Sequence, residues 1–263
     1  MQKLFDLVLK IGSNPVAFVR YCVYFVKQYR ANDLLRFANN VKTDKGVDIH
    51  NYIRAYDYFL KARRSEKLVF CEIGLLQDRF QTSSKQDRNS KGSSEESYPT
   101  APSLRMWCDY LPNATVIGFD ISTFQQPKDK KCFIVQGDQN SRDDLEKILD
   151  IEKRLDVVID DALHASPHQQ ISLSYLFPHL KSGGLYFIED LRYQPDGFER
   201  SDVPKTLELL KKLKTTGVWS SPLSTPEEKK ILEHHVKEIH FFESLKYSNP
   251  TSGKDAMALI VKK

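Results

Sequence analysis

Five short apolar runs, separated by helical stretches, constrain the fold of this chain more than any other feature. Continuous β-rich runs of this length are typical of strands buried on both faces. Strands that alternate with helices form a parallel, doubly wound sheet. The runs are LVFCEIG (68–74), TVIGFDIS (115–122), CFIVQGD (132–138), LDVVIDD (155–161) and GLYFIED (184–190). The sequence therefore predicts an α/β fold with ligands bound at the carboxyl ends of the strands.

The segments around this pattern extend it at both ends. EIHFFESL (238–245) and AMALIVKK (256–263) flank a turn-rich stretch and predict a final hairpin, which brings the sheet to seven strands. Residues 1–65 carry helical periodicity and predict an N-terminal extension or lid, with the catalytic domain over 66–263. The Ser-rich stretch 82–100 cannot bury apolar area, so we expect a mobile insert, either a lid or a plain disordered loop.

An aromatic stripe stands at the end of the extension. In the segment 50–60, Tyr52, Tyr56 and Phe59 recur on one helical face. This pattern most often means core packing. A lid facing the substrate is the alternative.

Composition excludes several classes of protein. A chain of 263 residues with 40% hydrophobic content can bury one large core. The net charge is only +4 and the basic residues are scattered, so we expect no nucleic-acid partner. The apolar segment 16–26 is interrupted by Arg20 and is shorter than the roughly 20 residues of a spanning helix, so membrane-surface association is not expected.

The cysteines predict the cellular compartment of the protein. Cys22, Cys71, Cys108 and Cys132 lie far apart without CxxC spacing. This spacing argues against a zinc site or a disulfide framework. We interpret them as reduced thiols in a cytoplasmic protein.

Three strand ends predict a nucleoside-binding edge. Gly74, after Glu72-Ile73, lets the backbone approach a ligand. Asp120 ends the second strand, where an acid accepts hydrogen bonds from ribose hydroxyls, and Asp138-Gln139 follow the third, near an adenine edge. Leu75 follows Gly74 where a dinucleotide site would need a glycine turn, so S-adenosylmethionine, which has no phosphates, fits better. Loop or helix-capping acids are the alternative explanation.

The next two strand ends predict a reaction site. Asp160-Asp161 and His164 follow the fourth strand, and Glu189-Asp190 follow the fifth. Neighbouring parallel strands lie roughly 4.8 Å apart, so these side chains can share one cation, for which oxygen ligands favour Mg²⁺, with Mn²⁺ or Ca²⁺ as alternatives. A metal lowers the pKa of a bound hydroxyl and His164 can take its proton. Ordinary loop acids and a structural histidine remain the alternative, and His168 is interpreted as a helix-surface residue.

Several blocks of the sequence resemble a known family. They are SLRMWCDYLPNATVIGFDIS, VQGDQN, VVIDDALHASPHQQ and LFPHLKSGGLYFIEDL. The blocks resemble the metal-dependent sugar O-methyltransferases of macrolide and aminocoumarin antibiotic biosynthesis, of the mycinamicin, macrocin and noviose type. The resemblance spans about residues 52–192 and implies a Rossmann-like class I methyltransferase fold.

The resemblance also implies roles for individual residues. Asp161, Glu189 and Asp190 would bind Mg²⁺ and His164 would be the general base. The residues around the methyl donor would be Glu72, Gly74, Ser103, Asp120, Asp138 and Gln139, with Arg105 in support.

Two departures from the family pattern stand out. Ala162-Leu163 replaces the usual Gly-Ser between the metal aspartate and the histidine, and the Ser-rich insert replaces a glycine-rich segment after Gly74. The first change affects loop flexibility and acceptor access, and the second affects the contacts above the donor.

The sequence thus predicts methyl transfer from S-adenosylmethionine to a hydroxyl, most readily on a sugar of a glycosylated natural product or glycan. A metal-dependent methyltransferase of a catechol-like or other small-molecule hydroxyl is one alternative. A catalytically silent protein that binds S-adenosylmethionine is another. The expected partner is a small glycosylated acceptor, and the aromatic N-terminal helices leave a homo-oligomer open.

Overall fold

The computed structural model describes residues 33–41, 43, 45, 51–75, 101–243 and 255–263. The predicted insert 82–100, most of the predicted N-terminal extension and the apolar segment 16–26 lie outside the described residues. Among the described residues, no helix has the length and apolar character needed to cross a membrane.

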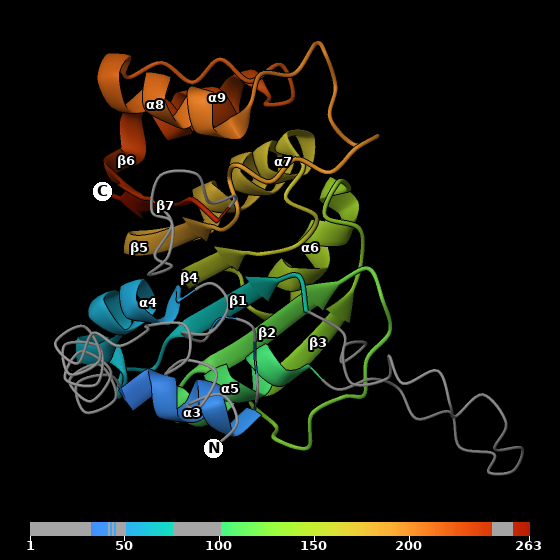
Figure 1. Cartoon of the computed structure of the whole chain (residues 1–263), viewed down its shortest axis with the longest axis vertical. Coiled ribbons are helices and arrows are strands. Elements are labelled where there is room, and N and C mark those ends of the chain that lie inside the picture. The colour runs from blue at the N-terminus through green and yellow to red at the C-terminus, as the bar shows by residue number, and fades with distance from the viewer. Residues whose placement is uncertain (1–32, 42, 44, 46–50, 76–100, 244–254) are drawn as a thin grey trace, which may run out of the picture.

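A seven-stranded sheet forms the centre of the molecule, in the order β3-β2-β1-β4-β5-β7-β6 (Figure 1). The strands β1 to β5 run parallel, whereas β7 pairs antiparallel with both β5 and β6. This arrangement confirms the predicted mostly parallel sheet and the final pair of strands. The strands are β1 (Val69–Ile73), β2 (Thr115–Asp120), β3 (Cys132–Gln136), β4 (Leu155–Asp160), β5 (Leu180–Ile188), β6 (Val236–Phe242) and β7 (Met257–Lys262).

Helices cover both faces of this sheet, and the strands explain why. Successive strand residues point to opposite faces, so Phe70 joins one hydrophobic core cluster while Cys71 joins the other. The first cluster includes α3 (Asp33–Val41), α4 (Ile53–Leu60) and α5 (Pro102–Tyr110), and the second includes α6 (Arg142–Ile151), α7 (Ser166–Leu176), α8 (Thr206–Thr216) and α9 (Pro226–His235). Short 3₁₀ helices, η1 (Lys61–Arg63) and η3 (Phe177–His179), continue α4 and α7.

Local sequence signals fix several helix ends. Ser141 caps α6 by accepting a hydrogen bond from the amide of Asp144, and Thr225 forms a capping box with Glu228 at the start of α9. Gly217 ends α8 in the left-handed conformation that glycine adopts without cost. These signals fix where the helices that flank the sheet begin and end.

A disulfide joins Cys108 of α5 to Cys132 of β3, with their Cα atoms 6.4 Å apart. The prediction of reduced thiols was therefore wrong for this pair. The two residues are 24 positions apart and belong to different elements, so a local spacing motif cannot predict the disulfide. Cys71 is a free, buried thiol.

Candidate active site

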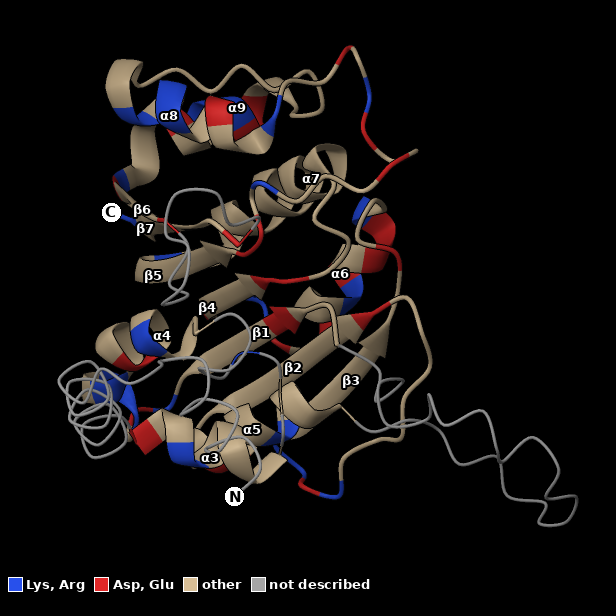
Figure 2. Cartoon of the chain, viewed as in Figure 1, with Lys and Arg blue, Asp and Glu red and all other residues tan. Residues whose placement is uncertain are grey.

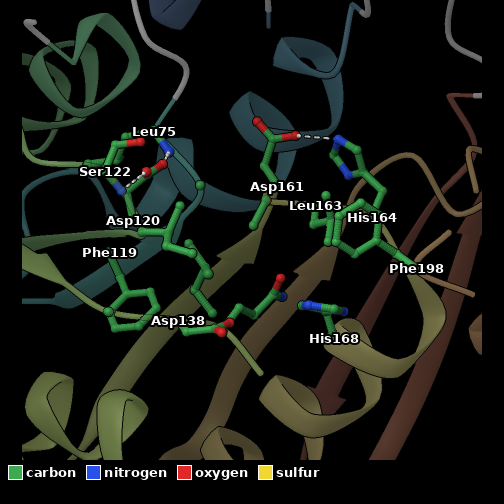
Figure 3. A pocket seen from close by; sticks show the side chains of 16 residues that line it. Leu75, Phe119, Asp120, Ser122, Asp138, Asp161, Leu163, His164, His168 and Phe198 are labelled. Atoms are coloured by element: carbon green, nitrogen blue, oxygen red, sulfur yellow. Dashed lines mark hydrogen bonds and ion pairs between the residues drawn. The ribbon is translucent and has the colours of Figure 1, made fainter. Parts of the chain in front are cut away.

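A pocket of about 770 Å³ opens at the carboxyl edge of β1, β2, β3 and β4 (Figure 3). Its lining combines apolar side chains with acids and histidines, as small-molecule sites do. In the described part of the chain the lining is Ile73, Gly74, Leu75, Phe119, Asp120, Ile121, Ser122, Gly137, Asp138, Gln139, Asp161, Ala162, Leu163, His164, His168 and Phe198. Asp120, Asp138, Gln139, Asp161 and His164, predicted from separate strand ends, are thus brought to one cavity.

Asp120 organises the wall between β1 and β2. Its carboxylate accepts hydrogen bonds from the amides of Leu75 and Ser122, both at 2.7 Å, as Figure 3 shows. These bonds are those of a loop-fixing acid. Each carboxylate oxygen has a further lone pair, so the same side chain can also accept from a ligand in the pocket.

Asp138 and Gln139 follow β3 and differ in their partners. Asp138 accepts from the amide of Asn140 at 2.8 Å and lines the pocket. Gln139 is buried, and its amide nitrogen donates to Asp160 at 2.6 Å and to Ser172 at 3.1 Å. Its amide oxygen has no partner among the described residues. An unpaired buried acceptor is costly, which makes it a natural contact for a ligand donor.

Gly74 lies at the tightest approach in the site. Its φ is +90°, and a Cβ there would lie 2.2 Å from the carbonyl oxygen of Asp161 and 2.5 Å from the Cα of Ala162. Its amide donates to the carbonyl of Phe119 at 2.8 Å. Glycine is therefore required here because the loop after β4 crosses directly over it, a reason the sequence did not reveal.

Glu72, Ser103 and Arg105 do not line the described pocket. Glu72 is fully buried on the opposite face of β1, where it accepts from the Ser103 hydroxyl at 2.8 Å and from the Trp107 indole at 3.2 Å. Arg105 points outward with 78% of its side chain exposed, near Asp109 at 3.9 Å. The structure therefore joins Glu72 to Ser103 but does not bring Arg105 to them.

Acidic side chains gather where β1, β4 and β5 end, and Figure 2 shows acidic colour at the tips of these central strands. Within this cluster lies the ammonium of Lys45, which is 1% exposed. Its Nζ donates to Glu189 at 2.9 Å and to Asp161, and it lies 3.3 Å from Glu72. Three carboxylates from three strands thus share one ammonium.

Two tyrosines of the aromatic stripe reach the same cluster. The rings of Tyr52 and Tyr56 are fully buried, which confirms the core-packing interpretation, whereas Phe59 is half-buried. The Tyr52 hydroxyl donates to Asp190 at 2.5 Å and the Tyr56 hydroxyl donates to Glu189. The stripe therefore holds two of the predicted acids as well as packing against the sheet.

His164 completes the rim beside these acids. Its Nε2 lies 4.0 Å from Asp161 and 3.8 Å from Asp190, while its Nδ1 is buried without a partner among the described residues. His164 and Asp190 adopt φ values of +64° and +51°. Such left-handed conformations cost free energy in non-glycine residues and are concentrated at functional sites.

Burial governs the electrostatics of the cluster. Desolvation, followed by repulsion from Asp161, holds the pKa of Glu189 well above its usual range, even though Lys45 and Tyr56 oppose the shift. Burial likewise raises the pKa of Glu72. Burial raises the pKa of Asp160 to about 6, against the hydrogen bonds from Ser172 and Gln139. The single ammonium of Lys45 therefore leaves the cluster short of positive charge.

His168 and Phe198 are lining residues that the sequence interpretation missed or misplaced. His168 was expected on a helix surface, but it lies in the first turn of the buried helix α7 and faces the pocket, where desolvation lowers its pKa. Phe198 comes from the loop after β5, and its ring centroid lies 6.1 Å from that of His168 (Figure 3). The prediction failed because α7 is buried between the sheet and α8 and α9 along almost its whole length.

Lys45 is the main residue that sequence reasoning missed. It lies 116 positions from Asp161 and 144 from Glu189, and nothing in the neighbouring sequence signals the contact. Among the described residues no group of three histidine, cysteine or acidic side chains is arranged to hold a metal as it stands. Lys45, Tyr52 and Tyr56 occupy the carboxylate oxygens instead.

The arrangement can perform proton transfer beside a bound small molecule. One end of the pocket offers acceptors at Asp120, Asp138 and Gln139. The other end offers an imidazole flanked by two carboxylates, and an imidazole can accept a proton from a bound hydroxyl. A hydroxyl placed near His164 would lie in the same cavity.

Comparisons with known proteins show which enzymes the chain resembles. No family model matches the chain. It is similar to the 8-demethyl-8-alpha-L-rhamnosyl tetracenomycin-C 2'-O-methyltransferase of Streptomyces olivaceus, with 31% identity over 63% of this chain and 40% of that protein. It is also similar to the mycinamicin VI 2''-O-methyltransferase of Micromonospora griseorubida, with 30% identity over 62% of this chain and 37% of that protein.

A third relative and a solved structure cover more of the chain. The demethylmacrocin O-methyltransferase of Streptomyces fradiae is 28% identical over 82% of this chain and 52% of its own length. The methyltransferase MycE of the mycinamycin pathway, solved with Mg, SAH and mycinamycin VI, superposes with a TM-score of 0.63. The match to MycE has 26% identity and covers 88% of this chain and 54% of MycE.

The chain spans between 36% and 52% of the length of the curated relatives that it matches. These matches confirm the resemblance to the macrolide type that the sequence blocks indicated. The chain is therefore a homologue of macrolide and tetracenomycin sugar O-methyltransferases and has the class I methyltransferase fold.

Proposed function

We propose that the chain is an S-adenosylmethionine-dependent, Mg²⁺-assisted O-methyltransferase that acts on a sugar hydroxyl of a glycosylated natural product or glycan. One observation carries this proposal: His164 and Asp161 line the same cavity as Asp120, and Asp190 lies 3.8 Å from His164. The activities of the relatives, which methylate sugar hydroxyls of glycosylated natural products, support the sugar acceptor.

The pocket fits the methyl donor in size and chemistry. Its volume lies within the range of small-molecule sites. In the proposed complex Asp120 accepts from the ribose hydroxyls, and Asp138 and Gln139 meet the adenine. Gly74 has no side chain, so the backbone after β4 can pass directly over it in the wall of the pocket. Glu72 and Ser103 support this wall from behind the sheet, and Arg105 has no part in it.

The carboxylates fit a divalent cation by chemistry and by charge. Asp161, Glu189 and Asp190 are the residues that would hold Mg²⁺, since hard cations prefer oxygen ligands. With Glu72 the cluster has four carboxylates, and Lys45 supplies one positive charge against them. When bound, Mg²⁺ would lower the pKa of the acceptor hydroxyl.

His164 would receive the proton of that hydroxyl. As the oxygen attacks, the bond between sulfur and the methyl group breaks, the bond between oxygen and the methyl group forms, and the proton ends on His164. Asp161 and Asp190, both within 4.0 Å of Nε2, stabilise the resulting imidazolium. Phe198 lines the same pocket as His164 and would help to exclude water from it.

The second candidate is a catalytically silent protein that binds S-adenosylmethionine. The Lys45 ammonium favours it, because a lysine can replace the metal ion in a relative that no longer uses one. Two measurements separate the candidates. The first is calorimetric titration of the full chain with S-adenosylmethionine, with and without Mg²⁺. The second is transfer of a labelled methyl group to glycosylated macrolides and glycans.

Donor binding without transfer to any glycosylated acceptor favours the silent protein, and absence of donor binding excludes both candidates. His164→Ala should lower transfer by about 10² to 10⁴ while leaving donor affinity unchanged. His234→Ala, on the exposed surface of α9, is the matched control and should retain full activity. Full transfer by His164→Ala would remove the base role.

A further inference from the structure

Lys45 occupies the centre of the proposed metal site. Its Nζ donates to Glu189 at 2.9 Å and to Asp161, two of the three proposed ligands, and lies 3.3 Å from Glu72. In the described part of the chain no other lysine or arginine is paired with these three carboxylates. The ammonium therefore stands where the carboxylate oxygens converge.

An ammonium and a divalent cation cannot both take this position. Each needs the same oxygens of Asp161 and Glu189, and two cations in direct contact repel each other strongly in a buried site. In their ionised form, the buried carboxylates are stabilised by a nearby positive charge. The site is thus built to contain one cation at a time.

We propose that Lys45 and a divalent cation are alternative occupants of this carboxylate site, so that the metal-free protein is neutralised by Lys45 and metal binding expels its ammonium. The inference rests on the metal site of the proposed function. Lys45 then acts as a built-in competitor that sets the metal affinity, while the carboxylates remain the ligands.

The backbone of Lys45 is bonded to the start of α4. The amide of Ile53, the first residue of α4, donates to the carbonyl oxygen of Lys45 at 3.3 Å. The same helix and its cap contribute Tyr56 and Tyr52, which bind Glu189 and Asp190. The side chain of Lys45 can therefore leave the carboxylates while its backbone and the two tyrosines stay in place.

Metal affinity of the full chain tests the competition directly. After removal of bound metal with a chelator, Mg²⁺ binding is measured by calorimetry and Mn²⁺ binding by the paramagnetic resonance signal of the free ion. Lys45→Met removes the competitor and should bind either ion about tenfold more tightly or better, as expected when a dominant competing state is eliminated. Lys262→Met is the matched control, because Lys262 is a buried lysine that, among the described residues, donates to the carbonyl oxygens of Phe177, Pro178 and Leu180 and to no carboxylate. The metal affinity of this variant should equal that of the wild type.

A measurement on the wild type covers the case in which Lys45→Met fails to fold. In protein labelled with ¹⁵N, the ammonium protons of Lys45 should exchange with water faster on saturation with Mg²⁺, because Nζ leaves the buried carboxylates of Asp161 and Glu189. Equal metal affinity of the wild type and Lys45→Met, or unchanged exchange of the Lys45 ammonium protons, would overturn the competition and leave the proposed function intact. If none of the three proteins binds metal, the metal role in the proposed function falls together with the competition.

Discussion

Replacement of Gly74 by alanine measures how closely the loop after β4 is held against β1. The new Cβ would lie 2.2 Å from the Asp161 carbonyl oxygen, a distance at which backbone has to move. An L residue with φ near +90° costs about 1 to 2 kcal/mol, and forcing an extra methyl group into packed structure costs about 1 to 3 kcal/mol more. Gly74→Ala should therefore lower the free energy of unfolding by about 2 to 5 kcal/mol.

Replacement of a second glycine separates the conformational cost from the cost of steric crowding. Gly217, at the end of α8, has φ +73°, and a Cβ there would have no atom within 4 Å, so Gly217→Ala should lose only the conformational part, about 1 to 2 kcal/mol. Urea unfolding of both variants, followed by circular dichroism, gives the difference. Because the Asp161 backbone has to move, Gly74→Ala should also bind the methyl donor and Mg²⁺ more weakly, whereas Gly217→Ala should not. Equal losses of stability in the two variants would refute the close approach.

Three further predictions concern features away from the pocket. Thr225→Ala breaks the capping box of α9 and should lower the free energy of unfolding by about 1 kcal/mol in urea, whereas no loss would contradict the cap. A non-reducing peptide map should find Cys108 linked to Cys132, and two free thiols would contradict the pairing. Reduction by dithiothreitol should lower the free energy of unfolding by about 3 kcal/mol, as expected for a loop of this length. Burial, followed by repulsion from Arg154, lowers the pKa of Lys262 to about 8. The unfolded chain then binds more protons above about pH 8, so the stability of the wild type relative to Lys262→Met should rise between about pH 8 and pH 10, and a falling difference would contradict the burial.

The strands were predictable because their signal is local. Runs such as the one from Leu155 to Ile159 are buried on both faces of the sheet. Such a strand can be recognised from its consecutive apolar residues alone. The clustering of Asp161, His164 and Glu189 followed from the same signal, since the carboxyl ends of parallel neighbours share one edge. The positions of the apolar runs therefore predict where the site residues gather as well as the fold.

The remaining features depend on contacts between distant segments. The pairing of Cys108 with Cys132 depends on how α5 lies against the sheet. The position of His168 depends on α8 and α9 covering the outer side of α7. The requirement for glycine at position 74 comes from the Asp161 backbone, not from a ligand. Local periodicity contains no information about such approaches.

The contacts of Lys45 and Tyr52 have a consequence for the order of folding. They join residues separated by 144 and 138 positions, so closing them requires long loops and follows the local pairing of strands and helices. Until then the assembling strands hold several carboxylates at one edge with no counter-charge, and their mutual repulsion opposes compaction. We therefore expect the contacts of Lys45 and Tyr52 to form late in folding, and we expect dissolved cations to speed the earlier steps by screening that repulsion.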